Sequence, residues 1–490
     1  MYHSTRGKEK VNSSIAIING LANDGGLYVK DEIKKFSYQE FEELSKLSYQ
    51  DLAVAIFKEY LNDFNLEQIE KVSKQAYDKK FDINEVVALK QFDDVNFLEL
   101  FHGPTLAFKD VALSILPLFM KESKEINKTS KKTIILTATS GDTGSAALKG
   151  FSYDENTAMI VLYPTDGVSA IQERQMLSLS NERLKVIAIE GNFDDAQKLV
   201  KKVFNDPHRF EYSPNIPLSS ANSINIGRLV PQIVYYFYSY FELVRKNEIK
   251  YGDKINFVVP TGNFGNILAG FLAKKMGLPI KKLICASNDN KVLTDFFNQK
   301  IYNKNREFLK TSSPSMDILV SSNLERLLYY GCEDVNKVQQ FMSDLDTNGL
   351  YNVDESFNKV LDDFYGSCAN EKEVSNGINE VYNKYNYLID THTAVAYCVY
   401  KKYLKETNDQ TKTIVVSTAH PYKFPNTIAE SIGLGKFDNE FEAIKVLKEK
   451  TNIEEPDMIK NLYKEFPKTV WKLDESYDNI KKLLLELNNE

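Results

Sequence analysis

The sequence has few residues of the kinds that build metal sites and disulfide frameworks. Its 490 residues include four cysteines and five histidines, and neither set shows a CxxC, HxH or HxxxH spacing. We therefore expect no metal site and no disulfide framework. Residues 1–10, MYHSTRGKEK, also lack the apolar core of a secretory signal, so we expect a reducing, cytoplasmic location.

An excess of positive charge and long hydrophobic runs are also missing. The 61 basic residues are outnumbered by 68 acidic ones, and a net charge of −7 is poorly suited to neutralising nucleic-acid phosphates. The longest apolar stretches, such as residues 233–241, are well short of the ~18–20 residues of a membrane span. We expect neither a nucleic-acid nor a membrane partner. With 43% hydrophobic residues, the chain can form a large globular core.

The chain divides into three predicted regions. Residues 1–95 show apolar residues three and four apart and predict a mainly helical N-terminal subdomain. Residues 96–435 alternate strand and helix signals, with a weaker, mixed stretch at about 300–390 in which NKVQQFMSDL and ESFNKVLDDFYG read as amphipathic helices. Residues 436–490 predict a C-terminal tail of helix or loop.

The central region predicts a parallel sheet. The runs TIILTA, TAMIVLYP, LKVIAIE, KINFVVP, KKLICAS and TIVVS are short and continuously apolar, and turn residues close them. Strands that are buried on both faces have this pattern, and helical segments lie between the runs. The sequence therefore predicts a doubly wound α/β fold.

Two of these strands lead into glycine-bracketed loops, TSGDTG at residues 139–144 and TGNFGN at residues 261–266. Each loop would leave backbone N–H groups free at a helix N-terminus, where an anion is favoured. For the first loop, a plain turn with Asp142 as the helix N-cap is about as good an interpretation. Neither loop has the GxGxxG or GxxxxGK[ST] spacing, which disfavours a dinucleotide-binding dehydrogenase and a P-loop NTPase.

A third segment, HGPTLAFKD, places Lys109 among apolar neighbours near the start of a predicted helix. Desolvation disfavours an ammonium ion, so such a lysine could offer a free amine to a carbonyl group, which is the chemistry of Schiff-base formation. The alternative is an ordinary lysine that reaches solvent beside Asp110.

Together these segments resemble the threonine synthase family of pyridoxal-phosphate enzymes. The matching strings, in the family's order, are HGPTLAFKD, TSGDTGSAAL, SANSINIGRLVPQ, PTGNFGN and STAHPYKFP, and NGLANDGGLYV near the N-terminus is similar too. The resemblance covers most of the chain. It implies fold type II, the tryptophan synthase β-like fold, with two parallel-sheet lobes, helices on both faces and the helical N-terminal subdomain.

The resemblance also implies roles for individual residues. Lys109 would attach to pyridoxal 5'-phosphate (PLP), and Thr418, with Ser417 as an alternative, would meet the pyridine nitrogen. The remaining assignments concern loops. The cofactor phosphate would be held by Gly262, Asn263, Phe264, Gly265 and Asn266, and the substrate carboxylate would be received by Ser140, Gly141, Asp142 and Thr143, with Asp142 near the cofactor ring hydroxyl.

The implied substrate, O-phospho-L-homoserine, carries a second phosphate. Arg228, with Asn222, Ser223 and Asn225 nearby, is the candidate for this group, because a guanidinium can bind phosphate with two hydrogen bonds. Asn225 and Arg228 are three residues apart and would share a helix face. Arg6 is a second candidate.

The implied activity is that of a PLP-dependent carbon–oxygen lyase acting on phosphates, which forms L-threonine and phosphate. Three alternatives remain open: a phospho-lyase that gives 2-oxobutyrate, a dehydratase of the same fold, and a non-catalytic binding protein on this scaffold. The sequence does not distinguish a monomer from a homodimer.

Overall fold

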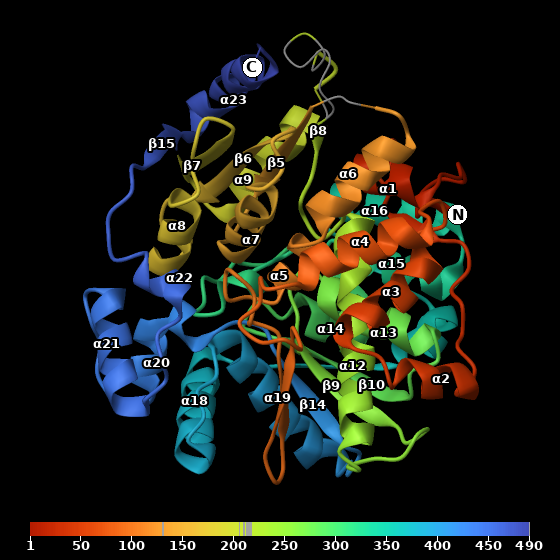
Figure 1. Ribbon diagram of the computed structural model, residues 1–490, viewed down its shortest axis with the longest axis vertical. Helices are drawn as coiled ribbons and strands as arrows, with labels where there is room; N and C mark the ends of the chain where they lie inside the picture. Colours follow the sequence, from red (N-terminus) through yellow and green to blue (C-terminus); the bar gives the residue numbers. More distant parts are fainter. Residues whose placement is uncertain (130–131, 205, 209–210, 212–217, 490) are drawn as a thin grey trace.

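The computed structural model describes residues 1–129, 132–204, 206–208, 211 and 218–489. Within this part, two main sheets form two lobes (Figure 1). The larger sheet has the order β13 (Phe364–Cys368), β10 (Ile280–Ser287), β9 (Ile255–Pro260), β14 (Thr413–Ser417), β4 (Asn96–Glu99) and β3 (Ala88–Gln91). The smaller has the order β15 (Thr469–Lys472), β7 (Leu184–Glu190), β6 (Thr157–Pro164), β5 (Thr133–Ala138) and β8 (Leu218–Ser219). All neighbouring strands are parallel except β3 and β4, which confirms the predicted two-lobed α/β fold.

Helices cover both faces of the smaller sheet, as its continuous apolar strands predict. Ile160 and Leu162 of β6 pack with α9 (Phe193–Phe204) and α23 (Leu473–Asn489). Met159 and Val161 point to the opposite face, where α7 (Asp142–Phe151) and α8 (Ala170–Leu177) lie. Successive side chains of a strand alternate between faces, so both sets must be apolar.

The larger sheet is covered in the same way. Its strands are flanked by α12 (Pro231–Arg245), α13 (Gly265–Lys275), α14 (Val292–Gln299) and α19 (Thr391–Thr407), and α18 (Glu371–Tyr385) packs on α19. The aromatic run at residues 235–241 is buried within α12, so its composition reflects core packing.

The N-terminal region is mainly helical, as predicted. Its helices are α1 (Ser13–Asn19), α2 (Tyr38–Leu44), α3 (Tyr49–Tyr60) and α4 (Leu66–Tyr77), and a small antiparallel pair, β1 (Tyr2–Ser4) and β2 (Tyr28–Lys30), accompanies them. This region lies against α12 and α6 (Leu116–Ile126). Strand β3, at residues 88–91, already belongs to the larger sheet.

The weakly patterned middle of the chain holds β11 (Ile301–Asn303), a 3₁₀ turn at Pro314–Met316, α15 (Leu324–Cys332), α16 (Val335–Thr347) and β12 (Leu350–Asn352). The segment ESFNKVLDDFYG was expected to be one amphipathic helix, and this prediction is wrong. It forms a 3₁₀ turn at Glu355–Phe357, then α17 (Asn358–Leu361), and it ends in β13. Phe364 pairs with Leu283 at the sheet edge, so tertiary pairing overrides the local helical pattern.

The tail contains α20 (Pro425–Ser431), α21 (Glu440–Thr451), α22 (Asp457–Lys460), β15 and α23. The expectation of only helix or loop is corrected by β15, which pairs with β7 at the edge of the smaller sheet. Four residues that are mostly exposed give too short a pattern to be recognised in the sequence.

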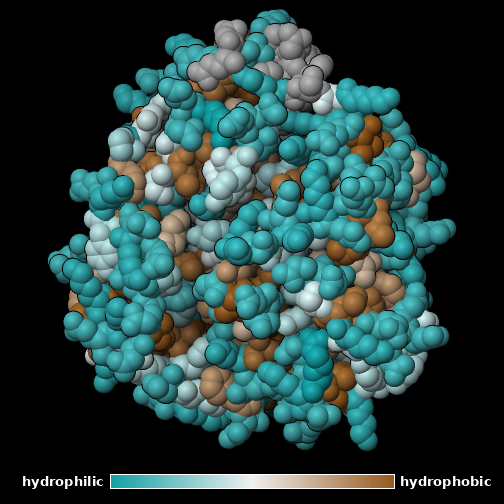
Figure 2. Space-filling view, viewed as in Figure 1, coloured by the Kyte–Doolittle hydropathy of each residue, from teal (hydrophilic) through white to brown (hydrophobic). Residues whose placement is uncertain are grey.

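The face shown in Figure 2 is mainly hydrophilic, and its hydrophobic residues lie in small separate groups. Among the described residues, no helix is long and apolar enough to cross a membrane.

Candidate active site

A cavity of about 450 Å³ lies at the carboxyl ends of strands from both sheets. Residues that directly follow β5, β9 and β14 line it, among them Thr139, Thr261 and Thr418. Ligands of open α/β sheets bind at this edge. Of the residues predicted for the site, Gly141 and Asn225 do not line the cavity. Those that do are Lys109, Ser140, Asp142, Thr143, Asn222, Ser223, Arg228, Gly262, Asn263, Phe264, Gly265, Asn266 and Thr418.

Lys109 is the first residue of α5 (Lys109–Leu113) and its side chain is only 9% exposed. Its Nζ lies 3.2 Å from Ser315 Oγ and 3.9 Å from Asp142 Oδ2. Burial lowers the pKa of Lys109 to about 8; Asp142 opposes this shift, and Arg228 and Lys423 add to it. An amine of this kind is available as a nucleophile and base near neutral pH.

The alternative of a solvent-reaching lysine beside Asp110 does not match this geometry. The Asp110 carboxylate accepts hydrogen bonds from the backbone N–H and the hydroxyl of Thr105, at 2.8 and 2.7 Å. Asp110 therefore fixes the turn that precedes the helix, and Lys109 faces the cavity.

The loop at residues 261–266 brings β9 into α13 with a tight turn. A Cβ atom at Gly262 would lie 2.4 Å from the backbone oxygen of Ser315, so only glycine fits there without a shift. Asn266, in the first turn of α13, accepts hydrogen bonds at Oδ1 from Tyr235 and Tyr236, at 2.7 and 2.8 Å. Its buried Nδ2 has no hydrogen-bond partner among the described residues.

The loop at residues 139–144 begins α7, and its N-cap is Gly141, with φ of 120°. The alternative interpretation with Asp142 as N-cap is therefore wrong. The Thr139 hydroxyl accepts instead from the N–H groups of Gly141 and Gly144, at 3.0 and 2.8 Å. Asp142 is thus free to make other contacts, and its Oδ1 lies 2.9 Å from Lys423 Nζ.

Arg228, in α11 (Ile226–Leu229), is buried and lines the cavity. Its Nη1 donates to the Ala221 backbone oxygen at 2.8 Å, and its buried Nε has no partner among the described residues. Burial lowers the pKa of this guanidinium to about 10, so it is still charged at neutral pH. Unused donors of a buried cation favour an anionic ligand.

The prediction that Asn225 and Arg228 share a helix face is wrong. Asn225 is the N-cap of α11: its Oδ1 accepts from Gly227 N at 2.9 Å, and its Nδ2 donates to the Ile17 oxygen at 3.0 Å. The rule of shared helix faces applies only within a helix, and a cap residue lies outside it.

Thr418 and Arg6 both line the cavity, and Ser417 does not. The backbone oxygen of Thr418 accepts from Phe108 N at 2.8 Å, which places Thr418 beside the lysine segment. Ser417 is fully buried and its hydroxyl lies 3.0 Å from that of Thr393. Arg6 is already paired with Glu325, at 2.9 and 2.8 Å.

Comparison with known families accounts for nearly the whole chain. Residues 1–77 match the model "Threonine synthase N terminus", residues 89–419 match "Pyridoxal-phosphate dependent enzyme", and residues 393–482 match "Threonine synthase, C-terminal". Threonine synthase of Saccharomyces cerevisiae is 38% identical over 464 residues, which cover 88% of this chain and 89% of that protein. The chain belongs to the threonine synthase family.

Solved structures of threonine synthases agree with this assignment. The PLP-bound enzyme from Brucella melitensis superposes with a TM-score of 0.85 at 34% identity, covering 100% of this chain and 99% of its own. The yeast threonine synthase structure gives 0.87 at 34% identity, covering 99% and 98%. This member of the family is therefore a PLP-dependent enzyme of fold type II.

The cavity of this threonine synthase family member fits PLP. Lys109 Nζ and Gly262 both approach Ser315, so the amine and the glycine loop border one space. The first N–H groups of α13 and the unpartnered Nδ2 of Asn266 suit an anionic group such as a phosphate.

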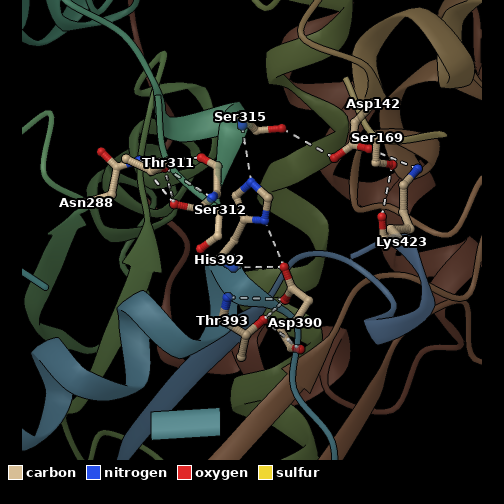
Figure 3. A network of polar contacts seen from close by, with 12 residues as sticks. Asp142, Ser169, Asn288, Thr311, Ser312, Ser315, Asp390, His392, Thr393 and Lys423 are labelled. Atoms are coloured by element: carbon tan, nitrogen blue, oxygen red, sulfur yellow. Dashed lines mark hydrogen bonds and ion pairs between the residues drawn. The ribbon is translucent and has the colours of Figure 1, made fainter. Parts of the chain in front are cut away.

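Sequence reasoning assigned no site role to Ser315 and Lys423, which contact Asp142, or to His392, which contacts Ser315 (Figure 3). Ser315 N donates to His392 Nε2 at 3.2 Å, and His392 Nδ1 lies 2.8 Å from Asp390 Oδ2. Asp390 is the N-cap of α19, so His392 lies in the first turn of that helix. Lys423 lies within the family-like string STAHPYKFP, which is the signal that could have found it.

Proposed function

We propose that this protein converts O-phospho-L-homoserine and water into L-threonine and phosphate. The observation that carries the proposal is that a buried lysine of lowered pKa, a glycine loop at a helix N-terminus and a buried arginine with an unused donor line one cavity. The glycine loop would hold the phosphate of the cofactor, and Arg228 would hold the phosphate of the substrate.

In this proposal Lys109 carries the cofactor, and residues 262–266 bind its phosphate. Thr418 meets the pyridine nitrogen, and Asp142 lies toward the ring hydroxyl. Ser140, Thr143 and the N-terminus of α7 receive the substrate carboxylate, while Arg228, Asn222 and Ser223 face its phosphate. All of these side chains line the cavity.

Bound PLP would supply an electron-accepting ring next to the substrate α-carbon. Lys109 Nζ would then remove the proton from Cα and afterwards one from Cβ, and phosphate would leave from Cγ. The two protons would be returned, one to Cγ and, at the end, one to Cα. Water would add its OH at Cβ, and its remaining proton would go to the released phosphate. One flexible amine can serve two adjacent carbon atoms, and with a pKa of about 8 it is about half unprotonated at pH 8.

The test is to incubate the purified protein with O-phospho-L-homoserine and to identify the organic product. Threonine and phosphate in equal amounts support the proposal. Mainly 2-oxobutyrate and ammonia would identify a phospho-lyase, and no turnover with bound PLP would indicate a binding protein.

The assignment of Lys109 is tested separately with Lys109→Ala. This variant should lose the visible absorption band of the attached cofactor and all turnover. Lys275→Ala, at the exposed end of α13, is the control and should keep both. A persisting band in Lys109→Ala would refute the assignment.

We also propose a cytoplasmic location. The four cysteines are unpaired within the described chain, which suits a reducing compartment.

A further inference from the structure

Lys423 is a fully buried cation beside the proposed active site. Its side chain has 0% exposure. Its Nζ contacts Asp142 Oδ1 at 2.9 Å and donates to the Thr105 backbone oxygen at 2.9 Å and to Gln175 Oε1 at 2.8 Å. An ammonium has three N–H donors, so this set of partners is complete.

These partners come from both lobes. Lys423 ends a 3₁₀ turn, Pro421–Lys423, that follows β14 of the larger sheet, whereas Asp142 and Gln175 lie on helices of the smaller sheet. Ser169, the N-cap of α8, also donates through its hydroxyl to the Lys423 backbone oxygen at 3.0 Å (Figure 3). The contacts of Lys423 therefore join the lobes where the cavity lies.

Asp142 needs a positive partner. Its side chain is 4% exposed, and an unpaired buried carboxylate is strongly disfavoured. Burial would raise the pKa of Asp142, but Lys423 and, at longer range, Lys109 and His392 hold it well below its usual value. Gln172 Nε2 also donates to Oδ1, at 2.8 Å.

Two lysines compete for this carboxylate. Lys423 is 2.9 Å from Asp142, and Lys109 is 3.9 Å away. If Asp142 depended on Lys109 for its counter-charge, the amine of Lys109 would be held protonated and could not attack a carbonyl group.

We propose that Lys423 is a positioning residue, the fixed interlobe counter-ion of Asp142, which frees the Lys109 amine from that ion pair so that it can react with the aldehyde of the cofactor. The inference rests on the role of Lys109 proposed above. The titratable groups that face Lys109 are Asp142, Arg228 and Lys423, and those that face Asp142 are Lys109, Lys423 and His392.

The experiment follows reloading of PLP onto the full-length protein after the cofactor has been removed. The rate at which the visible band returns is measured from pH 6 to pH 10, and thermal unfolding of each cofactor-free variant checks its fold. In the unaltered protein the rate should rise with pH with a midpoint near 8. In Lys423→Met the midpoint should move up by about one unit, which slows reloading about tenfold at pH 7.

Three further variants separate charge from structure. Lys423→Arg keeps the charge and should keep the midpoint near that of the unaltered protein. Asp142→Asn should move the midpoint down, and Asp142→Asn combined with Lys423→Met should return it toward 8. If Lys423→Met does not fold, Lys423→Gln takes its place, because it also removes the charge but keeps a side chain that can donate hydrogen bonds to Asp142 and Thr105.

An unmoved midpoint in the folded variants, with slower reloading at every pH, would mean that Lys423 only supports the structure and would overturn the inference. A Lys109→Ala variant that still regains the band would instead refute the proposed role of Lys109, so the two failures are distinguishable.

Discussion

Asn266 offers a sharp test of the proposed phosphate site. Its Oδ1 is already occupied by the hydroxyls of Tyr235 and Tyr236, so only Nδ2 is left to meet a ligand. In Asn266→Asp the shape and the tyrosine contacts are kept. The atom in the position of Nδ2 changes from a donor to an acceptor, and at high pH it carries negative charge.

The expected loss of cofactor affinity can be bounded. A hydrogen bond to a charged group contributes about 1.5–3 kcal/mol. Two like charges 4 Å apart at a partly screened site add repulsion of about 4 kcal/mol. Because the new carboxyl group can take up a proton to avoid this repulsion, we expect a loss of about 2–5 kcal/mol. This corresponds to PLP binding at least about 30-fold weaker, and weaker at pH 9 than at pH 6.

The assay is equilibrium titration of the cofactor-free protein with PLP, followed by the visible band. Tyr236→Phe is the control, because it removes one partner of Oδ1 and leaves the Nδ2 donor in place. Two results would refute the placement of the phosphate at Asn266. One is a PLP affinity of Asn266→Asp within threefold of that of the unaltered protein. The other is a loss of PLP affinity in Tyr236→Phe as large as the loss in Asn266→Asp.

Three other predictions use different parts of the structure. Gly262→Ala places a methyl group 2.4 Å from the Ser315 backbone oxygen and should cost about 1–3 kcal/mol, seen as a lower melting temperature and weaker PLP binding. Arg228→Met should lower kcat/KM for O-phospho-L-homoserine about 100-fold while the visible band is unchanged; a lost band would place Arg228 at the cofactor instead. Burial lowers the pKa of His102, but hydrogen bonds to Asp82 and Glu99 more than offset this and raise it to about 9. Protonated His102 therefore stabilises the folded state fully below pH 6.5, and this contribution is lost as the pH rises through 9. His102→Gln lacks the contribution at every pH. The urea midpoint of unfolding should therefore change less between pH 6.5 and pH 9 in this variant than in the unaltered protein.

The sheets could be predicted from the sequence because their strands are buried on both faces. In β6, Met159 and Ile160 point to opposite helix layers, and the strand must be apolar at both positions. The edge strands β13 and β15 could not be predicted in this way. Three of the four residues of β15 are exposed, and β13 begins shortly after the helix α17, so the pairing of both strands depends on neighbours that are distant in the sequence.

The backbone of the candidate site was also predictable. Strand-to-helix turns are local, and Gly262 and Asn266 are recognisable from spacing because the helix N-terminus follows immediately. The same local reasoning failed at Asn225, where the cap position of the residue, and not its spacing from Arg228, decides where its amide points.

The protonation state of Lys109 is a property of the tertiary structure. The string HGPTLAFKD shows that apolar residues surround this lysine, which accounts for the burial that lowers its pKa. The same string cannot show that a buried carboxylate lies 3.9 Å away, which would tend to keep the amine charged. Whether that carboxylate holds the proton on Lys109 depends on Lys423, which reaches Asp142 from the other lobe at 2.9 Å. A lysine motif on this fold therefore indicates where a cofactor attaches, and the counter-charges brought in by folding decide at which pH the amine can act.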